Sequence, residues 1–375
     1  MHRNDFVRQL NSPGGDRRPS RILNIDAPLL LILIALCSIG LTVLYSASAE
    51  SIFYVKRQAT FMLIGLFAMI AIAQFPPRLW ERWSVLIYLC GLLSLVAVLF
   101  FGVGAKGAQR WLDLGITRFQ PSELMKIAVP MTLAAYLGKR HLPPRFKHVA
   151  VAIIATLVPV LLVARQPDLG TSLIIFSSGF FALFLAGLGL RYLLSAALLA
   201  MAAVPTMWFY VMLDYQKQRV LTLLSPEQDK LGAGWNIMQS TTAIGSGGLS
   251  GKGWSQGTQS QLNFLPESHT DFIIAVLAEE FGLIGVLGML LLYLMLVGRC
   301  MMISLNAQSM FGRIMAGTIS LTFFVYIFVN MGMVSGILPV VGAPLPFISY
   351  GGTAIVTLFL GFGILMAIST EPKRI

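Results

Sequence analysis

Charged residues are scarce in this sequence. Lys and Arg number 27 and Asp and Glu number 16 among 375 residues, which is 11%, whereas 56% of the residues are hydrophobic. Soluble globular domains carry roughly 25% charged residues, and disordered chains are more polar still. The composition therefore argues against both classes, and it makes the few charges the most informative residues.

Cysteine and histidine are also rare. Cys37, Cys90 and Cys300 all lie within or at the end of apolar runs, so no disulfide framework is expected in the loops. Of the four histidines, only His269 lies outside the N-terminal tail and the 139–148 loop. No zinc-binding spacing is present, and no metal ligand set is assigned.

Long apolar runs dominate what remains. Many are near 20 residues, the length of a helix that crosses about 30 Å of hydrocarbon. Residues 149–164 lack the alternation of a transmembrane barrel strand. We predict an all-α polytopic membrane protein with about ten transmembrane helices. The expected spans are residues 28–47, 58–75, 84–103, 122–137, 149–165, 170–189, 192–212, 271–298, 312–334 and 351–369.

Residues 1–26 form a basic tail that carries five arginines ahead of the first run. Cytoplasmic segments are enriched in Lys and Arg, so we expect this tail and, with ten spans, the C-terminus to be cytoplasmic. Residues 47–49 are also compatible with cleavage of a signal peptide, although the run is long enough to span. Residues 27–375 are expected to form one integral membrane domain.

The net charge of +11 raises the question of nucleic acid binding. No compact basic domain is present to hold a nucleic acid, so we expect none to bind. Membrane lipid headgroups and an anionic substrate are the expected counterparts.

One large extracytoplasmic loop, residues 213–270, is expected before the eighth span. Disorder is the simplest reading of so long a loop, but Trp235, Ile237 and Trp254 favour a segment that packs onto the protein. Residues 245–253 contain five glycines and Lys252. They could place backbone N–H groups near phosphate oxygens, or simply form a flexible turn-rich loop.

The large loop ends on an acidic residue, Asp271. Ser268 and Asp271 fit the S-x-x-[DE] pattern of a helix start, so Asp271 could cap the eighth span. Ser268, His269 and Asp271 could also suggest a Ser-His-Asp hydrolase site, but triad members meet through the fold and cannot be inferred from adjacency in the chain. Glu279 and Glu280 follow on other faces of the same helix, and we expect one of them to bind a neighbouring helix.

Four more charged residues occupy or flank the spans. Glu123 and Lys126 lie three residues apart near the start of the fourth span, where a mutual ion pair competes with a role in binding substrate. Asp168 lies in the short loop before the sixth span, and Arg110 lies in an outer loop. Asp168 and Arg165 of the same short loop are expected near the outer surface, close to the large loop.

Residues 336–352 are apolar but include three prolines within eight residues, which prevents a regular helix. Irregular backbone at membrane depth survives only where protein or a water-filled cavity shields it. We therefore predict a re-entrant segment lining a groove before the tenth span. An interfacial loop is the alternative.

Several of these motifs together resemble the SEDS family of shape, elongation, division and sporulation proteins. The matching segments cover essentially the whole chain from the first span to the last, and residues 257–262 are more similar to the elongation branch than to the division branch. The segments are residues 106–111, 119–123, 166–171, 245–253, 265–272 and 338–352.

The resemblance implies a peptidoglycan glycosyltransferase that polymerises lipid II for cell elongation and rod shape. It implies an active site at the outer face of the cytoplasmic membrane and a class B penicillin-binding protein as partner. Asp271 matches the family's essential aspartate. Arg110, Glu123, Lys126 and Asp168 match other positions that matter in the family.

The chemistry of such a transfer suits these residues. Displacing undecaprenyl diphosphate with inversion needs a base for the acceptor 4-hydroxyl, and Asp271 is the candidate. Positive charge for the diphosphate would come from Arg110, Lys252, Arg219 or a divalent cation such as Mg²⁺ or Mn²⁺. The sequence also allows two other functions, a lipid II flippase and a non-enzymatic scaffold of the elongation complex.

Overall fold

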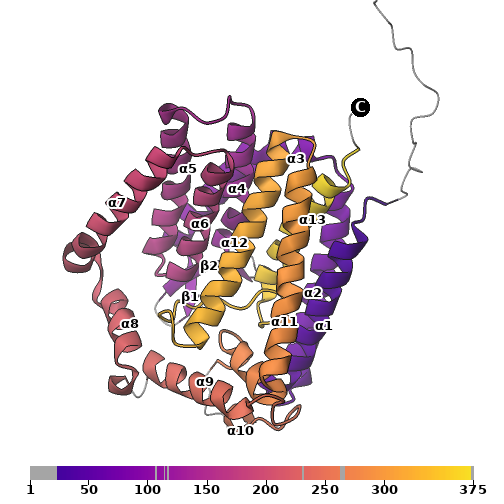
Figure 1. Ribbon diagram of the computed structural model, residues 1–375, viewed down its shortest axis with the longest axis vertical. Helices are drawn as coiled ribbons and strands as arrows, with labels where there is room; N and C mark the ends of the chain where they lie inside the picture. The colour runs from indigo at the N-terminus through magenta and orange to yellow at the C-terminus, as the bar shows by residue number, and fades with distance from the viewer. Residues whose placement is uncertain are drawn as a thin grey trace, which may run out of the picture.

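The structure is a computed structural model of the chain, shown in Figure 1. It describes residues 23–105, 108–113, 115, 118–229, 232–261 and 267–372. Most of the basic N-terminal tail, residues 106–107 of the first matching motif and residues 265–266 of the motif that ends in Asp271 lie outside the described residues.

Each of the ten predicted spans coincides with a helix. The helices are α1 (Ala27–Ala47), α2 (Ile52–Ala73), α3 (Pro77–Phe101), α4 (Pro121–Gly138), α5 (Phe146–Arg165), α6 (Leu169–Leu185), α7 (Leu190–Thr206, continued by the π-helical turn Met207–Val211), α11 (Ile273–Asn306), α12 (Met310–Val334) and α13 (Gly352–Ser369). The fold class predicted from the sequence is confirmed.

Eight helices of the described chain are long and apolar enough to cross a membrane: α1, α2, α3, α5, α7 with its π-helical turn, α11, α12 and α13. Of the other two, α6 is a shorter apolar helix of 17 residues, and α4 contains Glu123 and Lys126. The protein is therefore an integral membrane protein, while a count of ten spans stays a prediction.

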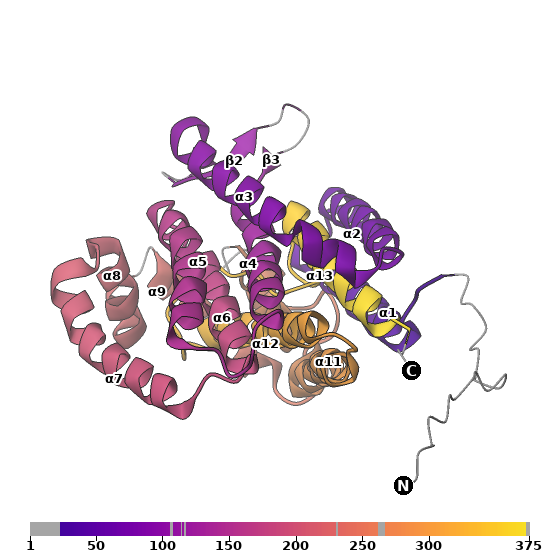
Figure 2. The same ribbon diagram turned by 90° about the horizontal axis from the view of Figure 1, so that it is seen from above.

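The helices pack into a bundle (Figures 1 and 2), and a cluster of buried aromatic rings lies inside it. The ring of Phe347, from the segment between α12 and α13, lies 5.0 to 6.0 Å from the rings of Phe323, Phe359 and Phe362. Burying such rings supplies apolar area and favourable edge-to-face contacts. The proline-rich segment thus helps to form the core of the bundle.

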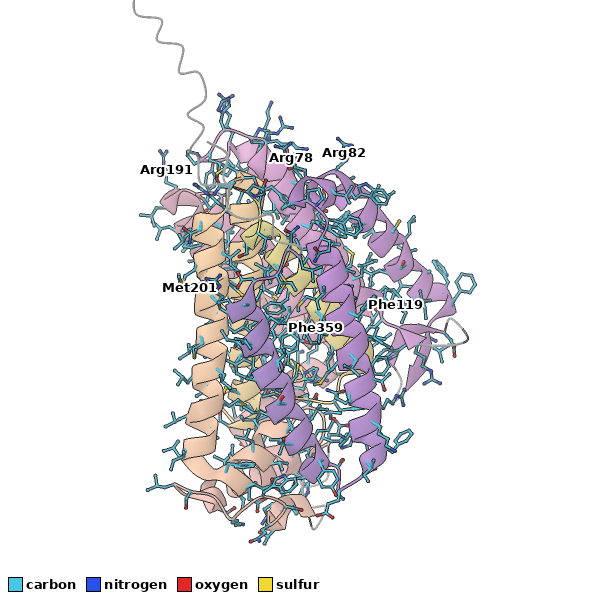
Figure 3. All side chains as sticks on the ribbon, turned by 90° about the vertical axis from the view of Figure 1, so that its right-hand side faces the viewer. Arg78, Arg82, Phe119, Arg191, Met201 and Phe359 are labelled. Atoms are coloured by element: carbon cyan, nitrogen blue, oxygen red, sulfur yellow. The ribbon has the colours of Figure 1, made fainter. Side chains whose placement is uncertain are left out.

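Basic side chains gather at one end of the bundle. Figure 3 shows Arg78, Arg82 and Arg191 at that end, and α9 and α10 lie at the opposite end in Figure 1. Near the start of α1, buried Asp26 forms an ion pair with Arg299 of α11 at 2.6 Å. It also accepts a hydrogen bond from Ser369 of α13. These bonds join three helices.

A small antiparallel sheet, which the sequence analysis did not predict, follows α3 and lies beside the bundle (Figure 2). Its order is β1 (Val103–Ala105), β2 (Ala108–Asp113) and β3 (Arg118–Phe119). β1 pairs with β2, and β2 pairs with β3 through Leu112 and Phe119. The sheet carries Arg110 on β2.

The large loop is mostly helical. It contains α8 (Asp214–Leu224), a 3₁₀ turn (Pro226–Gln228), α9 (Ala233–Gly247) and α10 (Thr258–Gln261). Ile237 is buried, and the Trp254 ring lies 5.8 Å from that of Tyr45 while its indole nitrogen donates to the Thr42 carbonyl of α1. The expectation that this segment packs onto the protein is confirmed.

The glycine-rich segment fills a break in α11. Gly282 has a φ of 64°, so the helix is interrupted there. The amides of Leu283 and Ile284 donate instead to the Gly248 and Leu249 carbonyls, at 3.0 and 3.1 Å. In return, the amides of Lys252 and Gly253 donate to the carbonyls of residues 279 and 280, both at 3.0 Å.

This arrangement corrects one reading of the sequence. The two amides at residues 252 and 253 are bonded to α11 carbonyls, so they do not form a phosphate cradle. Glycine is needed because a Cβ on Gly251 would meet the Glu280 carbonyl and one on Gly247 would meet the Ala278 carbonyl. The glycines allow close backbone contact, as small residues do elsewhere.

The first prediction concerns this break. Gly282→Ala should destabilise the protein by at least about 1–3 kcal/mol, because a positive φ strains alanine and the new Cβ would meet the Gly251 nitrogen. The thermal midpoint of the detergent-purified protein measures this. Gly288→Ala is the matched control, since a Cβ there has no neighbour within 4 Å. Equal midpoints for the two variants would show that the pairing of the glycine-rich segment with α11 at Gly282 does not stabilise the protein.

Candidate active site

Asp271 lies in a turn, residues 267–272, immediately before α11. The N-cap residue of α11 is Phe272 and not Asp271, so the prediction of Asp271 as the N-cap is wrong. Ser268 instead donates its hydroxyl to the Ala47 carbonyl at 2.9 Å. Asp271 is partly exposed, as a residue that meets substrate must be.

The turn is fastened to the proline-rich segment. The Tyr350 amide donates to the His269 carbonyl at 2.9 Å, and the Ser349 hydroxyl donates to the Thr270 carbonyl at 2.5 Å. Ser349 Oγ also accepts a 2.8 Å bond from the Leu345 amide. Two bonds therefore join the turn that carries Asp271 to the segment, and the third holds Ser349 in place within the segment.

The Asp271 carboxylate lies against Gly342. A methyl group built on Gly342 would sit 3.5 Å from Asp271 Oδ2, and Gly342 has a φ of 76°. On the other side of the same segment, a methyl built on Gly170 would lie 2.9 Å from the Val341 carbonyl oxygen. Two glycines thus let the first turn of α6, the segment and Asp271 approach one another.

The proline-rich segment enters the bundle interior. Phe347 and Ile348 are fully buried, and the Tyr293 hydroxyl of α11 donates to the Pro346 carbonyl at 2.6 Å. A Cβ on Gly40 of α1 would lie 2.5 Å from the Phe347 carbonyl oxygen. Irregular backbone shielded by surrounding helices is the arrangement that we predicted, whereas a groove beside it stays a prediction.

Asp168 and Arg110 stabilise the entrance to α6. Asp168 is buried, and it caps α6 by accepting from the Thr171 amide at 3.1 Å and from the Gln120 side chain at 3.0 Å. Arg110 donates to the carbonyls of Gln166, at 3.2 Å, and Pro167. The structure thus places both residues around one short loop, a contact that the sequence did not predict.

Glu123 and Lys126 form the predicted ion pair, at 2.7 Å and nearly buried. Lys126 also donates to the Tyr326 hydroxyl at 3.1 Å, and the Thr357 hydroxyl donates to Glu123 at 3.2 Å. The group therefore joins α4, α12 and α13. It lines a cavity of about 50 Å³ whose other walls are mostly apolar.

Lys252 and Arg219 lie in the large loop rather than in these networks. Lys252 forms a 2.7 Å ion pair with buried Glu279, which also accepts from the Gln259 amide at 2.9 Å. Glu280 accepts a hydrogen bond from Ser46 of α1, which confirms that one of the two glutamates binds a neighbouring helix. Arg219 is half-buried in α8.

His269 contributes little positive charge to this turn. Its ring lies 5.1 Å from Tyr54 and 6.3 Å from Tyr350, and burial lowers its pKa, although Glu267 opposes that shift. The direction of the shift keeps the imidazole largely neutral at pH 7, because its ordinary pKa is about 6.5. Positive charge near Asp271 must come from other groups.

Two residues of this region were missed as candidates in the sequence. Asn330 of α12 donates its amide to the Asp271 carbonyl at 3.0 Å and to the Ala343 carbonyl at 2.6 Å. A lone asparagine in an apolar run is itself a signal of function at membrane depth. Tyr326, on the same helix, carries a hydroxyl that only the folded structure places beside Lys126.

Comparison with known proteins identifies the family. Residues 27–374 match the family model described as "Cell cycle protein", which groups FtsW, RodA and SpoVE. The chain belongs to this family. The resemblance inferred from the motifs is thereby confirmed over nearly the whole chain.

The curated relatives include peptidoglycan glycosyltransferase MrdB of Escherichia coli K12, which is 53% identical over 353 residues and aligns with 94% of this chain and 95% of its own. A solved structure described as "Structural coordination of polymerization and crosslinking by a peptidoglycan synthase complex" matches with a TM-score of 0.82 at 30% identity, covering 92% of this chain and 97% of the other.

A crystal structure of the rod shape determining protein RodA of Thermus thermophilus also matches. Its TM-score is 0.72 at 28% identity, and the match covers 93% of this chain and 98% of that one. Together with the MrdB match, it confirms that this chain is most like the RodA branch of the family.

The second prediction concerns the buried ion pair of this RodA-like chain. Lys126→Met should cost about 3–5 kcal/mol, because it leaves the Glu123 carboxylate buried without its partner. The double variant Glu123→Gln with Lys126→Met should be much less destabilised, because neither charge remains. Thermal midpoints of the three proteins measure the difference. A double variant as unstable as Lys126→Met would show that the unpaired Glu123 charge is not the cause of the destabilisation.

Proposed function

We propose that this protein is a peptidoglycan glycosyltransferase that polymerises lipid II for cell elongation and rod shape. The single observation that carries the proposal is the position of Asp271. It lies in a turn that is hydrogen-bonded to the buried, irregular proline-rich segment. The 53% identity with the MrdB glycosyltransferase over nearly the whole chain supports the same reaction.

In this proposal Asp271 is the general base. Its carboxylate takes the proton of the acceptor 4-hydroxyl as that oxygen attacks the anomeric carbon of the donor. The bond from the anomeric carbon to the diphosphate oxygen breaks, the configuration inverts, and undecaprenyl diphosphate leaves with both bonding electrons. Diphosphate is a good leaving group, so no second carboxylic acid is needed of the kind that glycosidases use.

The developing negative charge on the diphosphate requires cations. We assign this role to Arg110, Lys252 and Arg219, and we assign Asp168, Glu123 and Lys126 to shaping the substrate site. A guanidinium has five N–H donors. Arg110 uses donors on Nε and one terminal nitrogen for backbone carbonyls, so the same side chain can hold the loop and a phosphate.

A divalent cation, Mg²⁺ or Mn²⁺, is part of the proposal. Within the described part of the chain, no three His, Cys, Asp or Glu side chains gather to hold a metal. In the proposal, substrate phosphate oxygens supply most of its ligands. The cation would neutralise charge on the leaving diphosphate.

We place both termini in the cytoplasm and the active site at the outer face of the cytoplasmic membrane. Arg78, Arg82 and Arg191 gather at one end of the bundle (Figure 3), which the positive-inside rule assigns to the cytoplasm. The partner would be a class B penicillin-binding protein that crosslinks the strands. The matching synthase complex couples polymerization and crosslinking, which supports this.

The third prediction tests the base. Purified Asp271→Asn protein with its partner should form almost no glycan polymer from lipid II, because an amide cannot accept the hydroxyl proton. General bases contribute about 10²- to 10⁴-fold in rate, so a loss in this range is expected. Gel separation of labelled strands measures it.

Glu227→Gln is the control, since it neutralises an exposed carboxylate on the 3₁₀ turn of the same loop. Polymerisation by Asp271→Asn at the wild-type rate would remove Asp271 from the mechanism. Lipid II translocation in liposomes without polymer, from the wild-type protein and its partner, would favour a flippase instead.

The fourth prediction tests the cation. Chelation with EDTA should slow polymerisation by the wild-type protein, and added Mg²⁺ or Mn²⁺ should restore it, because the diphosphate loses charge compensation. A parallel measurement of the thermal midpoint checks that chelation leaves the fold intact. Unchanged polymerisation in EDTA would show that protein cations alone compensate the leaving group.

A further inference from the structure

Asn330 is an unusual residue for its position. It lies within α12, which is one of the two most buried spans, and its side chain is completely buried. Removing an amide from water is costly unless its hydrogen-bonding groups find partners. A leucine would fill a similar volume without that cost.

The Asn330 amide nitrogen has two partners. It donates to the carbonyl of Asp271, at 3.0 Å, and to the carbonyl of Ala343, at 2.6 Å. The two acceptors belong to the turn before α11 and to the proline-rich segment. Because only a donor group can face two carbonyl oxygens, the amide orientation follows from its partners.

The other half of the amide is unsatisfied. Asn330 Oδ1 is buried and has no hydrogen-bond partner among the described residues. A buried acceptor without a partner carries a desolvation penalty. Such a penalty, retained in the middle of a helix, is typical of sites where position matters more than stability.

We infer that Asn330 is a positioning residue that fixes the Asp271 carboxylate against the proline-rich segment. Its two bonds set the spacing between the Asp271 backbone and Ala343, and the neighbour of Ala343, Gly342, is the residue that Asp271 Oδ2 faces. The segment is in turn locked in the core through Phe347 and Tyr293. Asn330 therefore holds the backbone of Asp271 at a fixed position relative to α12.

This inference rests on the proposed role of Asp271 as the base. Displacing a catalytic group by about 1 Å can cost 10²-fold in rate. Asn330 does not need to touch the substrate to have this effect. Its loss should lower kcat while leaving substrate binding nearly unchanged.

The test uses full-length protein with its partner and lipid II, and compares Asn330→Leu with Ser320→Ala. Ser320 is an equally buried residue of α12, and its hydroxyl donates to the Val297 carbonyl of α11 at 3.1 Å. Ser320→Ala therefore removes a buried bond from α12 to α11 without touching the Asp271 turn. Asn330→Ala serves as the second variant if Asn330→Leu does not fold.

The expected result for Asn330→Leu is a kcat about 10²-fold lower, with the KM for lipid II changed by less than about 3-fold. Its thermal midpoint should fall at least as far as that of Ser320→Ala, because the carbonyls of Asp271 and Ala343 lose their donor. Ser320→Ala should keep a wild-type kcat.

A folded Asn330→Leu or Asn330→Ala protein with wild-type kcat would overturn the inference, as would a loss of kcat matched by Ser320→Ala. Asp271→Asn in the same assay separates the two claims. If Asp271→Asn is inactive and Asn330→Leu is fully active, only the positioning role fails. If Asp271→Asn is active, the proposed base itself fails.

Discussion

The structure depends on one constraint: irregular backbone buried in a helical bundle must have its polar groups satisfied by other parts of the protein. Three prolines prevent residues 339–346 from forming a helix. Tyr293 and Asn330 satisfy carbonyls of this segment, and Ser349 accepts from its Leu345 amide. Each of these partners fixes the segment to a helix or to the turn that carries Asp271.

The same constraint explains how distant motifs form one site. Gly170 at the start of α6 and Gly342 in the segment permit close backbone approach, and Asp271 lies on the other side of Gly342. Asp168 and Arg110 hold the loop before α6 in place. Motifs from the sheet after α3, the start of α6 and the turn before α11 thus meet around a segment that makes no regular structure of its own.

The sequence predicted the class, the position of each apolar helix and the Glu123–Lys126 pair, because apolar runs and rare charges are local signals. It did not predict the three-stranded sheet, Phe272 as the N-cap residue of α11, or the pairing of the glycine-rich segment with α11 at Gly282. Those features depend on contacts between residues far apart in the chain, such as Leu283 with Gly248. Asn330 stands out in the sequence as an asparagine in an apolar run, but only the fold shows that it bonds to Asp271 and Ala343.

The central claim is that the turn and the proline-rich segment hold the Asp271 carboxylate where an acceptor hydroxyl arrives. A structure of the protein with its partner and a bound, non-reactive lipid II analogue and acceptor strand in a lipid nanodisc tests this most directly. The account predicts the acceptor 4-oxygen at hydrogen-bond distance, about 2.6–3.2 Å, from Asp271. An acceptor oxygen bound well beyond that distance, with another side chain or water chain in contact with it, would contradict the account.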